Sequence, residues 1–166
     1  MGMIIIVMGL PGSGKSYFAR LLAEKLNASY LSSDKVREML HLKGRYNLED
    51  KMFVYEWLAN ITEGLLEGKA IVVVDATFYL NSTRQLFLNL GQKHQVAVKF
   101  LVISAPISLI KKRLERPRAD SEADFLAFKK IKAEFEQMSL PCLKLRSSSD
   151  NITHMLEEAV NYINVT

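Results

Sequence analysis

Residues 9–16 read GLPGSGKS, and this glycine-rich stretch is the most informative part of the chain. The six residues before it, 3–8, are all apolar and mostly β-branched, which predicts a buried strand. Apolar residues recur at helical spacing over 15–26, which predicts a helix directly after the stretch. A strand, a glycine-rich turn and a helix N-terminus form an anion-binding site, because consecutive backbone N–H groups converge there and the helix dipole attracts negative charge.

The stretch matches the Walker A pattern, whose residues bind the phosphates of a nucleoside triphosphate. Gly9, Gly12 and Gly14 allow positive φ angles and a close approach of the backbone to the phosphates. Lys15 is expected to reach the β- and γ-phosphates, and the Ser16 hydroxyl to ligate Mg²⁺. We therefore predict that this stretch binds ATP with Mg²⁺, and that Pro11 stiffens the loop. The predicted ATP-binding residues are Gly9, Leu10, Pro11, Gly12, Ser13, Gly14, Lys15 and Ser16.

Length and composition predict one domain over residues 1–166. Hydrophobic residues make up 49% of the chain, enough for one core, and no repeat or long linker interrupts it. The net charge of +4 suits a phosphate-rich ligand without requiring nucleic acid. No apolar run approaches the roughly 20 residues of a membrane span, so we expect a soluble, cytoplasmic protein without a membrane partner. The single cysteine, Cys142, is expected to be a buried structural thiol.

Strand-like and helical runs alternate along the chain, which predicts an α/β fold: a three-layer P-loop NTPase fold with a central, mostly parallel five-stranded sheet. We expect strands at residues 3–8, 30–32, 70–74, 96–103 and 142–145, and helices at 15–26, 35–40, 49–66, 82–93, 107–116, 121–137 and 151–162. Gly68 and Gly91 fall where helices are expected to end, and Pro106 in the first turn of one. Ligands bind outside the carboxyl ends of parallel strands, so residues just after each strand are candidates for a site.

Two acids and an arginine follow the second and third strands. Asp34 either caps the next helix, as Ser33 also could, or accepts the proton of an incoming hydroxyl as a catalytic base. Arg37 lies one helical turn later and is either a phosphate ligand or a solvated surface arginine. Asp75 follows the third strand, as the acid of a Walker B arrangement does, and is expected to hold Mg²⁺ together with Ser16. From the residues alone, either aspartate could be the base.

A mobile lid is predicted at about residues 114–124, because proline, alternating charges and small residues gather there between two helices. Arg113 and Arg116 are the best candidates for side chains that cover the triphosphate and neutralise charge in the transition state, with Arg118 third. A solvated helix end is the alternative. Residues 44–68 are expected to build the acceptor site, and Trp57 within them to be a core residue.

With these motifs in place, the chain resembles the AAA_33-type predicted kinases, which belong with the P-loop kinases that include polynucleotide 5′-hydroxyl kinases and zeta toxins. The matching positions are 9–16, 32–37, 74–78 with Arg84 downstream, and 105–106 leading to Arg113 and Arg116. The resemblance implies that Asp34 is the catalytic base, that Arg37 binds an acceptor phosphate, and that Asp75 is a metal-binding or acceptor-side acid. It also implies that a lid arginine binds ATP.

The leading hypothesis is an ATP- and Mg²⁺-dependent phosphotransferase, a kinase that transfers the γ-phosphate to a hydroxyl acceptor. A nucleoside, a polynucleotide 5′ end and small molecules such as gluconate or adenylylsulfate are all open as acceptors. One alternative is an ATPase or nucleotide-dependent switch without a separate acceptor, and another is a nucleotide-binding module without turnover. A GTPase is disfavoured, because the chain has no Asn-Lys-x-Asp guanine motif.

Overall fold

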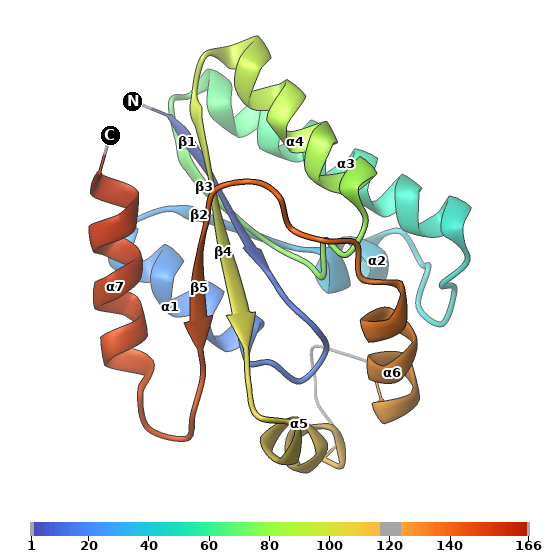
Figure 1. Cartoon of the computed structure of the whole chain (residues 1–166). Helices are drawn as coiled ribbons and strands as arrows, with labels where there is room; N and C mark the ends of the chain where they lie inside the picture. Colours follow the sequence, from blue (N-terminus) through green and yellow to red (C-terminus); the bar gives the residue numbers. More distant parts are fainter. Residues whose placement is uncertain (1, 117–123, 166) are drawn as a thin grey trace.

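The structure is a computed structural model that describes residues 2–116 and 124–165. Its centre is a five-stranded sheet in the order β2-β3-β1-β4-β5. The strands are β1 (Met3–Met8), β2 (Ser29–Ser32), β3 (Ile71–Asp75), β4 (Ala97–Ser104) and β5 (Cys142–Arg146). All pairings between neighbours are parallel, so the five carboxyl ends lie at one edge of the sheet, which is the lower edge in Figure 1.

Helices cover both faces of the sheet and its carboxyl edge (Figure 1). They are α1 (Lys15–Leu26), α2 (Ser33–Met39), α3 (Leu48–Glu67), α4 (Asn81–His94), α5 (Ile107–Leu114), α6 (Phe125–Glu134) and α7 (Ile152–Asn164). α1 and α7 lie on one face and α3 and α4 on the other, while α5 and α6 lie toward the carboxyl edge. This arrangement confirms the predicted three-layer α/β fold with a parallel five-stranded sheet.

The central strand β1 joins the two helical layers. Ile4 and Ile6 belong to a core formed with α3 and α4, whereas Ile5 and Val7 belong to a second core formed with α1 and α7. All four side chains are fully buried, because alternate residues of a strand face opposite sides and helices cover both. The glycine-rich loop therefore follows a strand that is buried on both faces.

Most predicted element bounds lie within two residues of those observed. The exception is α6, expected over 121–137, which ends at Glu134; residues 121–123 lie outside the described ranges. Gly68 ends α3 as predicted, whereas Pro106 directly precedes α5 instead of lying in its first turn. Cys142 is half-buried rather than buried. In the ranges that the structure describes, no helix combines the length and apolar character needed to cross a membrane.

The prediction that Gly91 ends a helix is wrong. α4 continues to His94 and ends at Gln95, which adopts a left-handed conformation. A Cβ atom added at Gly91 would lie 2.3 Å from Cγ2 of Val98 on β4. The glycine therefore lets α4 approach the sheet closely, and its role is packing rather than termination.

Candidate active site

The glycine-rich loop has the geometry of an anion cradle. Gly9, Gly12 and Gly14 all have positive φ, as predicted, and a Cβ at Gly9 would lie 2.3 Å from the Ile103 carbonyl oxygen. Gly14 is the N-cap of α1, and in the described chain no side chain caps this helix and no acid lies in its first turn. The first N–H groups of the helix, which begins at Lys15, therefore remain available to a phosphate.

Side chains from distant elements brace this loop from behind. The Ser147 hydroxyl donates to the Ser13 carbonyl at 2.7 Å. Arg113 donates from Nη1 to the Gly12 carbonyl at 3.1 Å and to the Ser147 oxygen at 3.0 Å. Burial lowers the pKa of Arg113, yet a guanidinium stays protonated at neutral pH. Arg113 thus lies against the loop backbone, and its contacts with the carbonyl groups help to orient the cradle.

A cavity of about 340 Å³ lies beside the cradle, between α1, α5, α7 and the loop after β5. Arg113 and Arg116 line it, together with Gly14, Tyr17, Phe18, Leu109, Lys112, Ser147, Ser148, Ser149, Asn151, Ile152 and Met155. This volume lies in the range of pockets for small ligands. Ser147, Ser148 and Ser149 were not predicted as site residues. They directly follow β5, so the rule that ligands bind at the carboxyl ends of parallel strands could have identified them.

A second cleft of about 80 Å³ opens in front of the cradle. It brings together Lys15 of α1, Asp34 and Arg37 of α2 and Asp75 of β3 at the same edge of the sheet. Its other lining residues are Pro11, Ser33, Tyr46, Lys51, Tyr55, Thr77, Tyr79 and Ile131. Lys15, Asp34, Arg37 and Asp75 therefore converge as the topology requires, whereas Ser16 is not among the lining residues and Arg113 lines the other cavity.

Asp75 is held in the site by a tyrosine. Its carboxylate is buried, and Oδ2 accepts a hydrogen bond of 2.8 Å from the Tyr30 hydroxyl. Burial and the adjacent charge of Asp75 raise the pKa of Tyr30, so this hydroxyl stays a donor. Across the described residues, Oδ1 of Asp75 has no hydrogen-bond partner. A buried carboxylate oxygen without a partner is suited to a metal ion or its water.

The donor set fits Mg²⁺ bound with a nucleotide. Asp75 offers an unpaired oxygen, and Ser16 lies in the first turn of α1. The part of the chain that the structure describes holds no group of three or more His, Cys, Asp or Glu side chains that could bind a metal alone. Mg²⁺ in nucleotide sites needs only one or two protein ligands, because phosphates and water complete its coordination.

Asp34 is not the cap of α2. The Ser32 hydroxyl caps this helix by accepting a hydrogen bond of 3.1 Å from the Lys35 backbone N–H. Asp34 lies in the first turn and lines the cleft with Lys15. The capping alternative, for Asp34 and for Ser33, is therefore wrong, and the position of Asp34 agrees with a role toward a ligand.

Arg37 is not a solvated surface residue. Only 7% of it is exposed, its Nη1 donates to the Arg45 carbonyl at 2.7 Å, and its guanidinium lies 4.6 Å from the centre of the Tyr46 ring. Arg37 lines the same cleft as Asp34. A buried guanidinium in a polar cleft is a strong candidate for an anion ligand.

The loop after β3 is held in a strained conformation. Phe78 has a φ of 48°, which bulky side chains rarely adopt, and it packs edge-on against Tyr55. The Tyr55 oxygen accepts a hydrogen bond of 2.9 Å from the Phe78 N–H and lies 3.3 Å from Thr77 Oγ1. Burial raises the pKa of Tyr55 to about 12. Tyr55 therefore fixes the position of Thr77 in the cleft.

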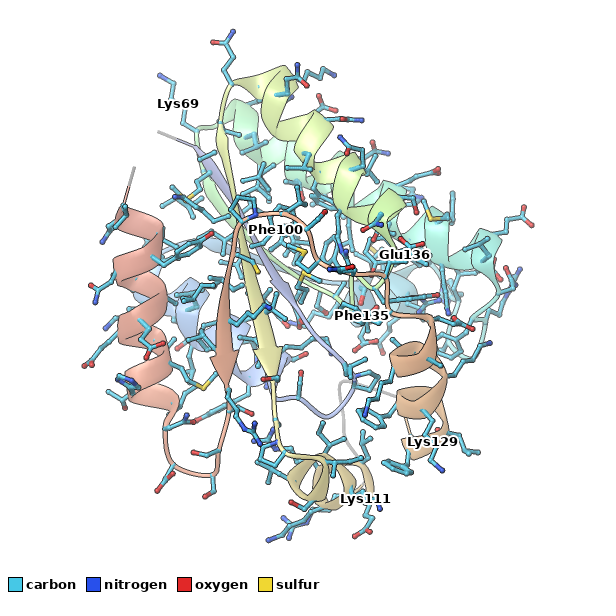
Figure 2. The ribbon with its side chains drawn as sticks, viewed as in Figure 1. Lys69, Phe100, Lys111, Lys129, Phe135 and Glu136 are labelled. Atoms are coloured by element: carbon cyan, nitrogen blue, oxygen red, sulfur yellow. The ribbon has the colours of Figure 1, made fainter. Side chains whose placement is uncertain are left out.

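Arg84, which the resemblance singles out, ties this loop to the chain after α6. It is almost fully buried and donates to the carbonyl oxygens of Phe78, Tyr79, Glu136 and Gln137. Figure 2 shows Phe135 and Glu136 on the segment that leads away from α6. The helix ends early because this extended segment supplies its carbonyls to Arg84.

Two further predictions concern the surroundings of the site. Trp57 is not a core residue: it is 38% exposed and contacts the exposed ring of Phe53 edge-on. Its helix is amphipathic, and Trp57 lies on the outer side. Arg118 and most of the predicted lid at 114–124 lie outside the described residues, whereas Arg116 is exposed at the rim of the larger cavity.

Comparisons with known proteins agree with this architecture. The AAA_33 family, described as an AAA domain, matches residues 4–138. An L-seryl-tRNA(Sec) kinase of Methanococcus maripaludis is 28% identical over 167 residues, which cover 96% of this chain and 62% of that protein. A gluconokinase of Arabidopsis thaliana is 25% identical over 158 residues, which cover 81% of this chain and 77% of that protein. The chain thus spans less than two thirds of the seryl-tRNA kinase.

A solved structure shares the whole fold. The APS kinase CysC of Mycobacterium tuberculosis, in complex with AMPPNP and APS, has a TM-score of 0.78 to this chain at 19% identity. The match covers 98% of this chain and 97% of that one. All the elements from β1 to α7 therefore follow the P-loop kinase architecture.

Proposed function

This chain belongs to the AAA_33 family, and on that premise we propose that it is an ATP- and Mg²⁺-dependent phosphotransferase that transfers the γ-phosphate of ATP to a hydroxyl group. The observation that carries the proposal is the cleft in front of the cradle, which Lys15, Asp34 and Asp75 line together. Phosphoryl transfer depends on positioning and electrostatics, for which a lysine, a base and a metal-binding acid are the main requirements. The two curated kinases support the same class of reaction.

The proposed role of each site residue follows from its position. Lys15 and the first N–H groups of α1 bind the β- and γ-phosphates, while the cavity lined by Arg113 and Arg116 accepts the nucleoside. Ser16 and Asp75 would hold Mg²⁺, which neutralises phosphate charge when bound. Arg113 acts mainly through the Gly12 carbonyl group of the loop, which it contacts.

Asp34 is the better placed of the two acids to accept the proton of the acceptor hydroxyl. Asp75 is buried and already accepts a hydrogen bond from Tyr30, whereas Asp34 is only partly buried in the cleft. The acceptor oxygen forms a bond to the γ-phosphorus, and the bond from this phosphorus to the β–γ bridging oxygen breaks. ADP leaves with the electron pair of that bond, and the proton passes to Asp34.

We also propose that residues 1–166 act as a single kinase domain of the cytoplasm, with a mobile lid at about 114–124. One sheet and its two cores include elements from β1 to α7, which supports a single domain. The kinase relatives are named for different acceptors, so nucleosides, polynucleotide 5′ ends and small hydroxyl compounds all enter the test.

The test uses ATP labelled at the γ-phosphate and a panel of nucleosides, oligonucleotides, RNA, gluconate and adenylylsulfate. Label on an acceptor supports the proposal. Release of free phosphate with every acceptor would favour an ATPase or switch, and unchanged ATP would favour a binding module. Either of these two results would contradict the phosphotransferase.

The first prediction concerns the two central side chains. Lys15→Ala and Asp34→Asn are each expected to lower kcat of transfer by at least about a hundredfold, because one removes a phosphate ligand and the other the base. Steady-state transfer at saturating substrates measures this effect. Lys25→Ala, an exposed lysine in the last turn of the same helix as Lys15, is the control and is expected to keep wild-type activity. Near-normal transfer by Asp34→Asn would show that the base has been assigned wrongly.

A further inference from the structure

Two cations that line the cleft, Arg37 and Lys51, form no ion pair with an acid among the described residues. Lys15 and Asp75, at the cradle end of the same cleft, already have roles toward the triphosphate. Asp34 lines the same cleft as these two positive charges.

Neighbouring cations of the same segment are paired. Lys43 lies 3.1 Å from Glu38, and Arg45 forms two hydrogen bonds with Asp50 at 2.9 and 3.1 Å. The segment thus supplies counter-ions to its exposed cations but not to the cations in the cleft. A buried guanidinium such as that of Arg37, which is 7% exposed, is costly without a counter-ion, and a bound anion would offset this cost.

Lys51 is positioned rather than freely mobile. Its Nζ donates to the Tyr79 hydroxyl at 2.9 Å and lies 5.0 Å from the centre of that ring. Tyr79 is only 5% exposed and follows the strained turn at Phe78, so it is a fixed support. Holding a lysine in one conformation costs side-chain entropy on folding. Less entropy is then lost when a ligand binds to its charge.

We propose that Lys51, held by the Tyr79 hydroxyl, is a second cation beside Arg37 that selects an acceptor carrying a doubly negative phosphate monoester. The acceptor is then a hydroxyl compound that carries such an anion, with its hydroxyl next to Asp34. This inference rests on the proposed function, because only a phosphotransferase has an acceptor. Binding of an anion at this site can nevertheless be measured without any phosphate transfer. Two cations match a dianion better than the single charge of a carboxylate.

The experiment titrates inorganic phosphate, sulfate and acetate into the full chain by calorimetry, after the cradle has been saturated with Mg²⁺ and AMPPNP. Phosphate and sulfate are expected to bind at least about tenfold more tightly than acetate. Lys51→Gln is expected to weaken phosphate binding about tenfold or more, and Tyr79→Phe by roughly two- to tenfold through loss of one hydrogen bond. Lys51→Arg keeps the charge and is expected to restore most of the affinity.

Lys43→Gln is the matched control, because it removes a lysine from the same segment but outside the cleft. Unchanged phosphate affinity in Lys51→Gln, equal affinity for acetate, or no phosphate binding by the wild type up to about 10 mM would each overturn the inference. Thermal unfolding of each variant checks that it is folded. Phosphate binding at Lys51 without label transfer to any acceptor would contradict only the phosphotransferase. Transfer with normal phosphate binding by Lys51→Gln would contradict only the anion site.

Discussion

At the scale of single residues, two tyrosine hydroxyls, those of the half-buried Tyr30 and the buried Tyr55, position groups of the site. Tyr30 holds one oxygen of Asp75 and leaves the other for a ligand, and Tyr55 holds the backbone of the turn after β3. Each hydroxyl pairs with a group far away in the sequence, so each links two elements at the carboxyl edge. Their removal should therefore alter the site without emptying the core.

The pH dependence of stability reports on Tyr55. Its pKa is about 12 in the folded chain against the usual 10.0 of a tyrosine, so above pH 10 the unfolded chain loses a proton that the folded chain keeps. The stabilisation is complete below pH 10 and is lost as the pH rises toward 12. Denaturant unfolding should show a steeper fall of the unfolding free energy over this range for the wild type than for Tyr55→Phe.

At neutral pH the same variant leaves the Phe78 N–H without its acceptor, which is expected to cost about 1–3 kcal/mol. Tyr17→Phe changes an exposed tyrosine and is the control for both measurements. Equal pH slopes for wild type and Tyr55→Phe would mean that Tyr55 does not carry the effect.

At the scale of elements, the contact between α4 and β4 depends on one glycine. Gly91 lies inside α4, where the approach of Val98 leaves no space for a Cβ. α4 in turn carries Arg84, which holds both the turn after β3 and the segment after α6. A shift of α4 on the sheet would therefore displace the turn after β3 and alter the cleft that this turn lines.

Two glycine substitutions separate packing from helix propensity. Gly91→Ala is expected to destabilise the chain by about 1–3 kcal/mol, because the added methyl group collides with Val98. Gly64→Ala, in α3, has no neighbouring atom within 4 Å and is expected to stabilise by about 0.5–1 kcal/mol. Denaturant unfolding of the two variants measures both effects. The packing argument fails if the two changes have the same sign.

At the scale of the whole molecule, ligand binding and folding are coupled through the cradle. Residues that contact the loop come from α5 and from the segment after β5, far from it in the sequence. Unfolding destroys the cradle completely, so any ligand that binds there must stabilise the native chain.

The prediction at this scale concerns Mg²⁺. AMPPNP with Mg²⁺ at about 100 times its dissociation constant is expected to raise the unfolding free energy by about 2.7 kcal/mol. Chelation of Mg²⁺ should remove part of this gain in the wild type. Asp75→Asn should show the same gain with and without Mg²⁺, whereas a full Mg²⁺ response in this variant would contradict the role of Asp75.

Local sequence patterns were enough to predict the sheet and the cradle. The apolar run before residues 9–16, the glycines within them and the helical pattern after them are local features, and each dictates the backbone around it. Asp34 and Asp75 could be placed at the edge of the sheet because parallel strands bring their carboxyl ends together. Local patterns and one topological rule were enough for these residues.

The surroundings of these residues depend on long-range packing and could not be predicted from local patterns. The Tyr30 hydroxyl meets Asp75 across 45 residues, the Ser147 hydroxyl meets Ser13 across 134, and Lys51 meets Tyr79 across 28. The burial of Arg37 and the packing role of Gly91 are likewise set by neighbours distant in sequence. Such contacts follow from how whole elements pack, and periodicity within a single element carries no information about them.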